Sequence, residues 1–348
     1  MASKSASPAS ATGNGSSQDP SPRALPAALQ EISVDEDYAN DTDSAFGAEI
    51  SSYSTSLVSS VLENSYEYGR RYHAYKGSDY VRPNDEAEKD RLDMNHQILR
   101  IVMHGKLFEA PVPQNVQRVL DVGCGTGLWA IEFADDHPSA EVLGVDLQPI
   151  QPTLVPPNLK FEIDDVEDEF PHTKPFDYIH CRYMAYSIKD WPRLVSQIYK
   201  HTAPNGIAEF MDYDLTYHCD DGSMDNTTLA QWGADLPRAG RLLGRDPCPG
   251  INLEKWVREA GFTQIVHKEY IMPLGPWPKD KHLKLLGAYN HMMVSQGVEA
   301  FTLRLFIKVL GWSHEEVQVL LAKVRRDLER KGIHIYTKVH AVWGVKGE

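Results

Sequence analysis

Cysteine is scarce in this sequence, and its spacing argues against the usual cysteine-based scaffolds. The four residues, Cys124, Cys181, Cys219 and Cys248, lie far apart and form no Cys-x-x-Cys pair. Neither a zinc knuckle nor the dense disulfide framework of small secreted domains fits that spacing. We therefore expect a reducing compartment and no metal site.

Basic residues are outnumbered, with 35 Lys and Arg against 49 Asp and Glu and a formal net charge of -14. Nothing resembles a basic stripe that would offset repulsion from a phosphate backbone, so direct nucleic-acid binding is not expected. No apolar run approaches the ~20 residues that a helix needs to cross a bilayer, so no membrane span is expected. The N-terminus lacks the apolar segment of a secretory signal, which predicts an intracellular protein, cytoplasmic or nuclear.

The 348 residues divide by composition and periodicity into a tail, a cap, a core and an insertion. The tail is rich in Ser, Ala and Pro, too poor in apolar surface to offset chain entropy, and is expected to be disordered. Helical spacing begins near Leu57 and passes into the aromatic stretch 66–75, and a second helix is expected over 85–104, with acidic residues in its first turn. The expected segments are a disordered tail (1–55), a helical cap (56–110), an α/β core (111–280), a helical insertion or lid (281–332) and a final core strand (333–348).

From residue 117 the sequence alternates short apolar runs with helical segments. This pattern is typical of a doubly wound α/β sheet whose parallel strands are joined by crossover helices. Helix-spaced apolar residues over 281–331 indicate an insertion that covers the carboxyl ends of the strands. The seven expected strands are 118–122, 141–145, 159–163, 176–181, 206–212, 263–271 and 336–345.

The stretch Asp121-Val-Gly-Cys-Gly-Thr-Gly127 joins the first of these strands to an apolar helix. Glycines permit positive φ and close approach of a ligand to the backbone, and helix N-termini favour bound nucleotides. In the dinucleotide fingerprint the third small residue would stand at Leu128, but here Gly127 comes one position earlier. Asp121 precedes Gly123 and Gly125 and offers a carboxylate to an ammonium group. The spacing therefore favours S-adenosyl-L-methionine over a nicotinamide dinucleotide.

Two further acidic positions follow neighbouring strands. Asp146 ends the second strand about 20 residues beyond the glycine loop, where a carboxylate accepts both hydroxyls of a ribose. After the third strand, the carboxylate of Asp165 is placed to accept from an adenine amino group, and the backbone N–H of Val166 faces a ring nitrogen. The alternative for residues 164–168 is a solvated acidic loop.

Several segments together resemble the fungal LaeA-like methyltransferases, over about residues 62–346. The segment series is far more specific than the glycine loop alone, and Cys124 within the loop is a departure that does not exclude the cofactor. The matching segments are Val119–Ile131, Val145–Pro152, Phe161–Asp168, Phe176–His180, Gly69–His73 and Ile188–Pro192.

This resemblance implies a seven-stranded class I methyltransferase fold whose last strand is antiparallel and inserted between the fifth and the sixth. It also implies S-adenosyl-L-methionine as cofactor and a role in fungal secondary metabolism. That role is either regulation with a velvet-type protein partner or tailoring of a metabolite. The methyl acceptor, a small molecule or a protein, is not specified by the resemblance.

Methyl transfer needs alignment of acceptor and methyl group more than a particular base, so no catalytic residue is assigned. The acceptor is expected over the carboxyl ends of the fourth and fifth strands, although His180 is better explained as a packed side chain. In residues 69–72, an Arg and a Tyr of the cap could contact the cofactor, or the segment could simply pack on the domain. The side chains expected near the acceptor are His180, Arg182, Tyr183, Asp212, Tyr213 and His218.

Three functions are compatible with these patterns. The first is an active methyltransferase, and the second is a regulatory module that keeps the fold and cofactor but acts through a partner. The third, a nicotinamide-dependent enzyme, is disfavoured by Gly127 and Leu128.

Overall fold

The computed structural model describes residues 64–73 and 81–348. The expectations for the tail, residues 1–55, and for a helix that begins near Leu57 therefore lie outside the described residues. The first described element is a β-hairpin of strands β1 (Asn64–Glu67) and β2 (Arg70–His73), which pair antiparallel.

The hairpin corrects the expectation that the cap is helical throughout. Its two-residue turn has positive φ at both central positions, 52° at Tyr68 and 80° at Gly69. This is the type I′ turn whose twist matches paired strands. Because Gly69 adopts that conformation at no steric cost, the local chain folds back instead of continuing as a helix.

Helix α1 (Glu86–Val102) follows, within one to two residues of the predicted helix 85–104. Asp85 caps its N-terminus by accepting from the backbone N–H of Glu88 at 3.1 Å. A side-chain oxygen at this position satisfies one of the helix donors that have no intrahelical acceptor.

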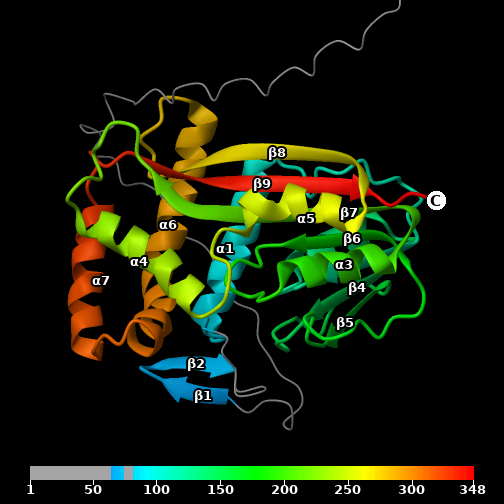
Figure 1. Cartoon of the computed structure of the whole chain (residues 1–348), viewed down its shortest axis with the longest axis horizontal. Coiled ribbons are helices and arrows are strands. Elements are labelled where there is room, and N and C mark those ends of the chain that lie inside the picture. The colour runs from blue at the N-terminus through cyan, green and yellow to red at the C-terminus, as the bar shows by residue number, and fades with distance from the viewer. Residues whose placement is uncertain (1–63, 74–80) are drawn as a thin grey trace, which may run out of the picture. The chain divides into compact units, whose positions relative to one another are not determined.

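The core is one seven-stranded sheet in the order β5-β4-β3-β6-β7-β9-β8 (Figure 1). Strand β9 lies between β7 and β8 and is antiparallel to both, which confirms the expected class I arrangement. The strands are β3 (Arg118–Val122), β4 (Glu141–Asp146), β5 (Leu159–Ile163), β6 (Phe176–Arg182), β7 (Thr202–His218), β8 (Thr263–Leu274) and β9 (Ile335–Val345).

Strand β7 is longer than the predicted 206–212. It continues beyond the parallel part of the sheet because β9 pairs with it as far as His218, opposite Tyr336, after a register shift. Long antiparallel partners of this kind are not visible in a local apolar run.

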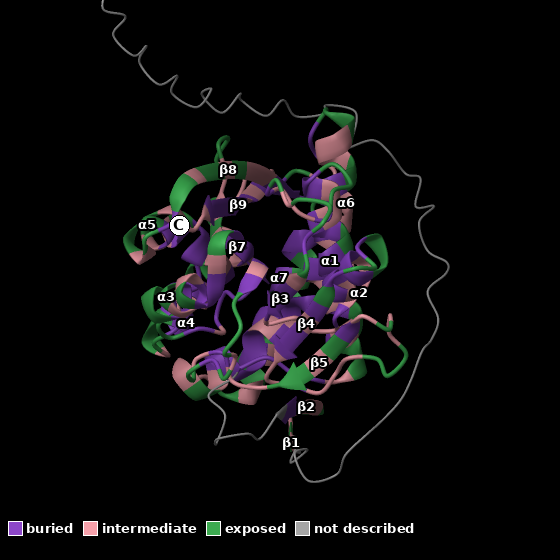
Figure 2. Cartoon of the chain, turned by 90° about the vertical axis from the view of Figure 1, so that its right-hand side faces the viewer, coloured by how far each residue is buried: buried purple, intermediate pink, exposed green. Residues whose placement is uncertain are grey.

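Both faces of the central strands are covered by helices. In β3, Val119 packs in the cluster that holds α2 (Leu128–Asp136), whereas Leu120 packs in the cluster of α3 (Trp191–His201) and α5 (Leu253–Ala260). Side chains alternate across a strand, so this division places α2 on one face and α3 with α5 on the other. Edge strand β5 is largely exposed (Figure 2).

A third cluster gathers the remaining helices beside the extended ends of β7, β8 and β9 (Figure 1). It contains α1 and the segment for which a helical insertion was expected. It also contains α4, which precedes β8 and was not foreseen. The helices are α4 (Thr228–Leu242), α6 (Lys281–Arg304), the π-helical turn η4 (Leu305–Val309) and α7 (His314–Leu328). A short 3₁₀ turn, η3 (Pro249–Asn252), precedes α5.

Candidate functional site

The loop between β3 and α2 has three glycines in the left-handed region, with φ of 71° at Gly123, 57° at Gly125 and 83° at Gly127. A Cβ at Gly123 would overlap the thioether of Met184, and one at Gly127 would overlap the ring of Phe161. At Gly125 the space is almost open. The first and third glycines therefore allow the loop to pack, and the second leaves backbone exposed to a ligand.

Asp146, at the end of β4, holds this loop in place. Its Oδ2 accepts from the backbone N–H of Gly125 at 2.8 Å, and its Oδ1 accepts from that of Gln148 at 2.9 Å. Burial raises the pKa of Asp146 to about 6, although these backbone donors oppose the shift. A carboxylate has about four acceptor positions, so lone pairs remain for a ribose.

Asp121, at the end of β3, is buried and only half satisfied. The Nδ1–H of His180, on the neighbouring strand β6, donates to its Oδ1 at 2.8 Å, while Oδ2 has no partner among residues 64–73 and 81–348. The His180 ring stacks on Trp129, with centroids 3.8 Å apart, and burial lowers its pKa. His180 is thus a packed side chain that orients Asp121, which agrees with the packing interpretation.

Arg182, two residues further along β6, supplies an unsatisfied donor. Its Nη2 donates to Nδ1 of His96, and the Nε2–H of His96 donates to Glu132 at 3.1 Å. Burial, followed by the charge of Arg182, lowers the pKa of His96 to about 2, so His96 is neutral and can accept. The Nη1 of Arg182 is buried and has no partner within the described part of the chain.

One cleft is lined by these groups, and we call it the glycine-loop cleft. Its lining includes Asp121, Gly123, Gly125, Asp146 and Arg182. It therefore combines a buried acceptor and a buried donor, both without a partner in the described ranges, with the glycine backbone and the carboxylate of Asp146. An ammonium and a carboxylate, as at the amino acid end of S-adenosylmethionine, would satisfy the two open positions. The residues present fit this cofactor.

The two residues assigned to adenine lie outside the lining of the glycine-loop cleft. Asp165 Oδ1 accepts from the backbone N–H of Glu167 at 3.0 Å, and the backbone N–H of Asp165 donates to Asp164 at 2.8 Å. Val166 packs in the cluster of β6 and α3. Both follow β5, which pairs with β4, so they stand beside the strand that carries Asp146. Their role in binding adenine stays a prediction.

The hairpin residues that were considered as contacts to the cofactor have other partners. Arg70 forms a bidentate pair with Asp85 at 2.6 and 2.8 Å. Arg71 donates to Asn84, and the ring of Tyr72 lies under the guanidinium of Arg304 at 3.7 Å. These contacts fasten the hairpin to the ends of α1 and α6, which supports the packing alternative.

The expected acceptor residues separate into different surroundings. Tyr183 lines the glycine-loop cleft and a second cavity, and Tyr213 lines only the second. Asp212 is buried and accepts from backbone N–H groups of Met184 and Tyr213, and burial raises its pKa to about 7. His218 pairs with Asp214 at 3.5 Å and lines neither space.

Sequence reasoning missed two features of the glycine-loop cleft. His96 on α1 was not considered, and Arg182, which was expected near the acceptor, lines the glycine-loop cleft together with Asp121. Their sequence separation of 86 residues gave no signal that they would meet.

In the described ranges, no helix is both long and apolar enough to cross a membrane.

A methyltransferase domain family model matches residues 94–268. Methyltransferase pytC of Aspergillus terreus is 44% identical over 80% of this chain and 87% of its own length. Secondary metabolism regulator LAE1 of Cochliobolus heterostrophus is 36% identical over 80% of this chain and 94% of its own. Protein-methionine methyltransferase laeA of Emericella nidulans is 37% identical over 79% and 74%.

The matched domain contains the glycine loop and the strands on either side of it, and each of these relatives is covered over more than two thirds of its length. The nicotinamide alternative therefore falls away. The chain belongs to the fungal LaeA-like family of class I methyltransferases, enzymes that use S-adenosylmethionine as their cofactor.

Proposed function

We propose that the glycine-loop cleft holds S-adenosylmethionine with its amino acid end at Asp121 and Arg182. The observation that carries this proposal is a pair of buried atoms in one cleft, Asp121 Oδ2 and Arg182 Nη1, neither of which has a partner among residues 64–73 and 81–348. Asp146 then accepts from the ribose, and the loop after β5 reaches the adenine. The proposed cofactor-binding residues are Asp121, Gly123, Gly125, Gly127, Asp146, Asp165, Val166 and Arg182.

When bound, the cofactor would supply an electrophilic methyl group for transfer to the acceptor. The residues of this chain orient the partners and exclude bulk water. Asp146 and Asp121 fix the two ends of the cleft, and no side chain is assigned as a base.

We further propose that the chain is a tailoring enzyme that methylates a small metabolite of fungal secondary metabolism. The 44% identical relative is named a methyltransferase, which favours an enzymatic role over a purely regulatory one. Its place of action is the cytoplasm or the nucleus.

The second candidate is a regulator that acts through a velvet-type protein partner. The names of two relatives favour it. The relative at 36% identity is named a secondary metabolism regulator, and the relative at 37% identity is named a protein-methionine methyltransferase. In that case the acceptor or the partner is a protein.

The test uses Gly125→Arg, which places a long side chain in open space in the glycine-loop cleft, and Asp146→Ala. Both are expected to abolish S-adenosylmethionine binding in calorimetry. Thermal unfolding of Gly125→Arg is expected to match that of its control, whereas Asp146→Ala is expected to unfold at a lower temperature because the backbone N–H groups of Gly125 and Gln148 lose their acceptor. Gly311→Arg is the matched control, since Gly311 also has a positive φ, 75°, and faces open space but lies outside this cleft.

Metabolite profiles of cells that carry these variants then separate the two candidates. Loss of one methyl group from one compound supports the tailoring enzyme, and a broad loss of many compounds supports the regulator. A full wild-type phenotype in cells with Gly125→Arg would show that the chain acts without its cofactor.

A further inference from the structure

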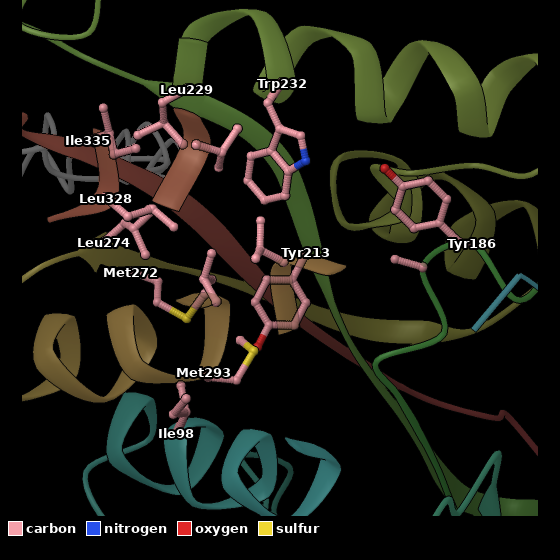
Figure 3. Packing of buried hydrophobic residues seen from close by; sticks show 14 of the residues in the cluster. Ile98, Tyr186, Tyr213, Leu229, Trp232, Met272, Leu274, Met293, Leu328 and Ile335 are labelled. Carbon is pink, nitrogen blue, oxygen red and sulfur yellow. The ribbon is translucent and has the colours of Figure 1, made fainter. Parts of the chain in front are cut away.

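A second cavity lies beside the glycine-loop cleft, and we call it the aromatic cavity. Its volume is about 70 Å³. Figure 3 shows Trp232 on α4, Tyr213 on β7 and Met293 on α6 directed toward one another. Most of the side chains that define it are aromatic or aliphatic, among them Tyr186, Tyr213, Tyr217, Trp232, Met293 and Phe301.

Tyr183 connects the two spaces, because it lines both of them. Its phenol oxygen accepts from Arg91 Nη1 at 2.9 Å and from Arg82 Nη1 at 3.4 Å. Arg91 is itself held by a buried pair with Glu88 at 2.7 Å. A molecule in the aromatic cavity therefore meets the glycine-loop cleft at a side chain whose position is fixed.

Two buried polar atoms without partners in the described residues belong to side chains that line the aromatic cavity, Asn290 Oδ1 and Thr337 Oγ1. Asn290 Nδ2 donates to the carbonyl oxygen of Pro273 at 2.8 Å. Since that carbonyl can only accept, the amide orientation is settled and Oδ1 is an open acceptor. A buried acceptor left without a donor costs free energy, so a ligand with a hydrogen-bond donor would satisfy it.

The charge of the wall selects against cationic ligands. The Arg82 guanidinium lies 5.3 Å from the ring centroids of Tyr183 and Phe301 and 5.7 Å from that of Tyr186. These rings already face a cation, so they are poor partners for a second one. A lysine or arginine side chain is disfavoured here, whereas a neutral aromatic ring can stack and fill the space.

We propose that the aromatic cavity is the acceptor site and that it takes a neutral, largely aromatic small molecule with a hydrogen-bond donor directed at Asn290 and Thr337. This inference rests on the proposed function, since the atom that receives the methyl group must lie beside Tyr183. It names the chemical class of the acceptor, which the family membership leaves open.

The test titrates 2-naphthol, a neutral aromatic with one hydroxyl donor, into the full chain saturated with S-adenosylhomocysteine. Binding is expected for the wild-type chain. Ala300→Phe, which fills the aromatic cavity, is expected to lower the affinity for 2-naphthol at least tenfold, while the affinity for S-adenosylmethionine stays unchanged. Val319→Phe on the exposed side of α7 is the matched control, and Ala300 is buried at the wall.

Thr337→Val keeps the shape and removes the hydroxyl, so it tests the polar contact without disturbing the fold. Loss of one neutral hydrogen bond is expected to weaken 2-naphthol about 2- to 10-fold. Affinity for naphthalene, which has no hydroxyl, is expected to stay at the wild-type value. Equal affinities of 2-naphthol for wild type, Ala300→Phe and Thr337→Val would overturn the proposal.

A second experiment incubates the chain with a fungal extract and S-adenosylmethionine that carries a labelled methyl group. It distinguishes a small-molecule acceptor from a protein acceptor. Label in the organic-soluble small molecules, reduced by Ala300→Phe, supports the aromatic cavity as acceptor site. Label in protein at the wild-type rate in Ala300→Phe overturns it. Failure of S-adenosylmethionine itself to bind would instead refute the proposed function, and Gly125→Arg is expected to lose the cofactor while 2-naphthol still binds.

Discussion

Asp121→Asn separates cofactor recognition from folding. The substituted amide can still accept from His180 through Oδ1, so the 2.8 Å contact is retained. What is lost is the carboxylate oxygen that has no partner among the described residues. A hydrogen bond to a charged group contributes about 1.5–3 kcal/mol, which corresponds to roughly a 10- to 150-fold weaker affinity for S-adenosylmethionine at 25 °C.

The same substitution is expected to leave the melting temperature of the ligand-free protein at or above wild type. The physical reason is that a buried, half-satisfied negative charge is replaced by a neutral group. Calorimetric titration measures the affinity, and scanning calorimetry measures the melting temperature.

A ligand control isolates the amino acid end of the cofactor. 5′-Methylthioadenosine has no ammonium or carboxylate, so its affinity is expected to be the same for Asp121→Asn and wild type. Asp177→Asn is the protein control, because Asp177 is a β6 carboxylate that accepts from backbone N–H groups of Gln117 and Arg118 outside the glycine-loop cleft. Wild-type S-adenosylmethionine affinity in Asp121→Asn would refute the assignment of the ammonium group.

Three other outcomes follow from the same geometry. Arg182→Met is expected to weaken S-adenosylmethionine but not 5′-methylthioadenosine in titration, and equal losses for both would contradict the carboxylate assignment. Gly127→Ala forces a Cβ onto Phe161 at a φ of 83°, at a cost of about 1–3 kcal/mol, so scanning calorimetry should show a clearly lower melting temperature than for Gly332→Ala. Asp146, with a pKa of about 6, loses its charge as the pH falls, so affinity should drop roughly tenfold between pH 7 and 5; Asp146→Asn should bind weakly and show no such pH dependence.

Local features of the sequence predicted most of the sheet. Strand β3 begins and ends at the predicted residues, because a strand buried on both faces is a continuous apolar run bounded by turns. The edge strand β5 also has the predicted bounds, and its alternation of apolar and polar residues is typical of a strand with one exposed face. The glycine loop was equally local, since its function depends on backbone φ at three positions within five residues. The hairpin at 64–73 was missed because helical spacing in the aromatic stretch was given more weight than the turn preference of Gly69.

Contacts between strands of the sheet could not be predicted from local sequence features. Asp121 meets His180 because β3 and β6 are neighbours in register, although the two residues are 59 positions apart in the chain. The strand order that brings them together depends on where the crossover helices pack, which is a property of the whole domain.

The sequence by itself determined the class of fold, the cofactor loop and the acidic residue that ends β4, because each depends on residues close together in the chain. Only the tertiary structure decided that Arg182 and Asp121 line one cleft. The aromatic cavity is likewise visible only after folding, since its walls come from β7, α4 and α6. The burial of a polar atom and its hydrogen-bond partners are determined by the packing of the whole chain, and they decide which polar atoms remain available to a ligand.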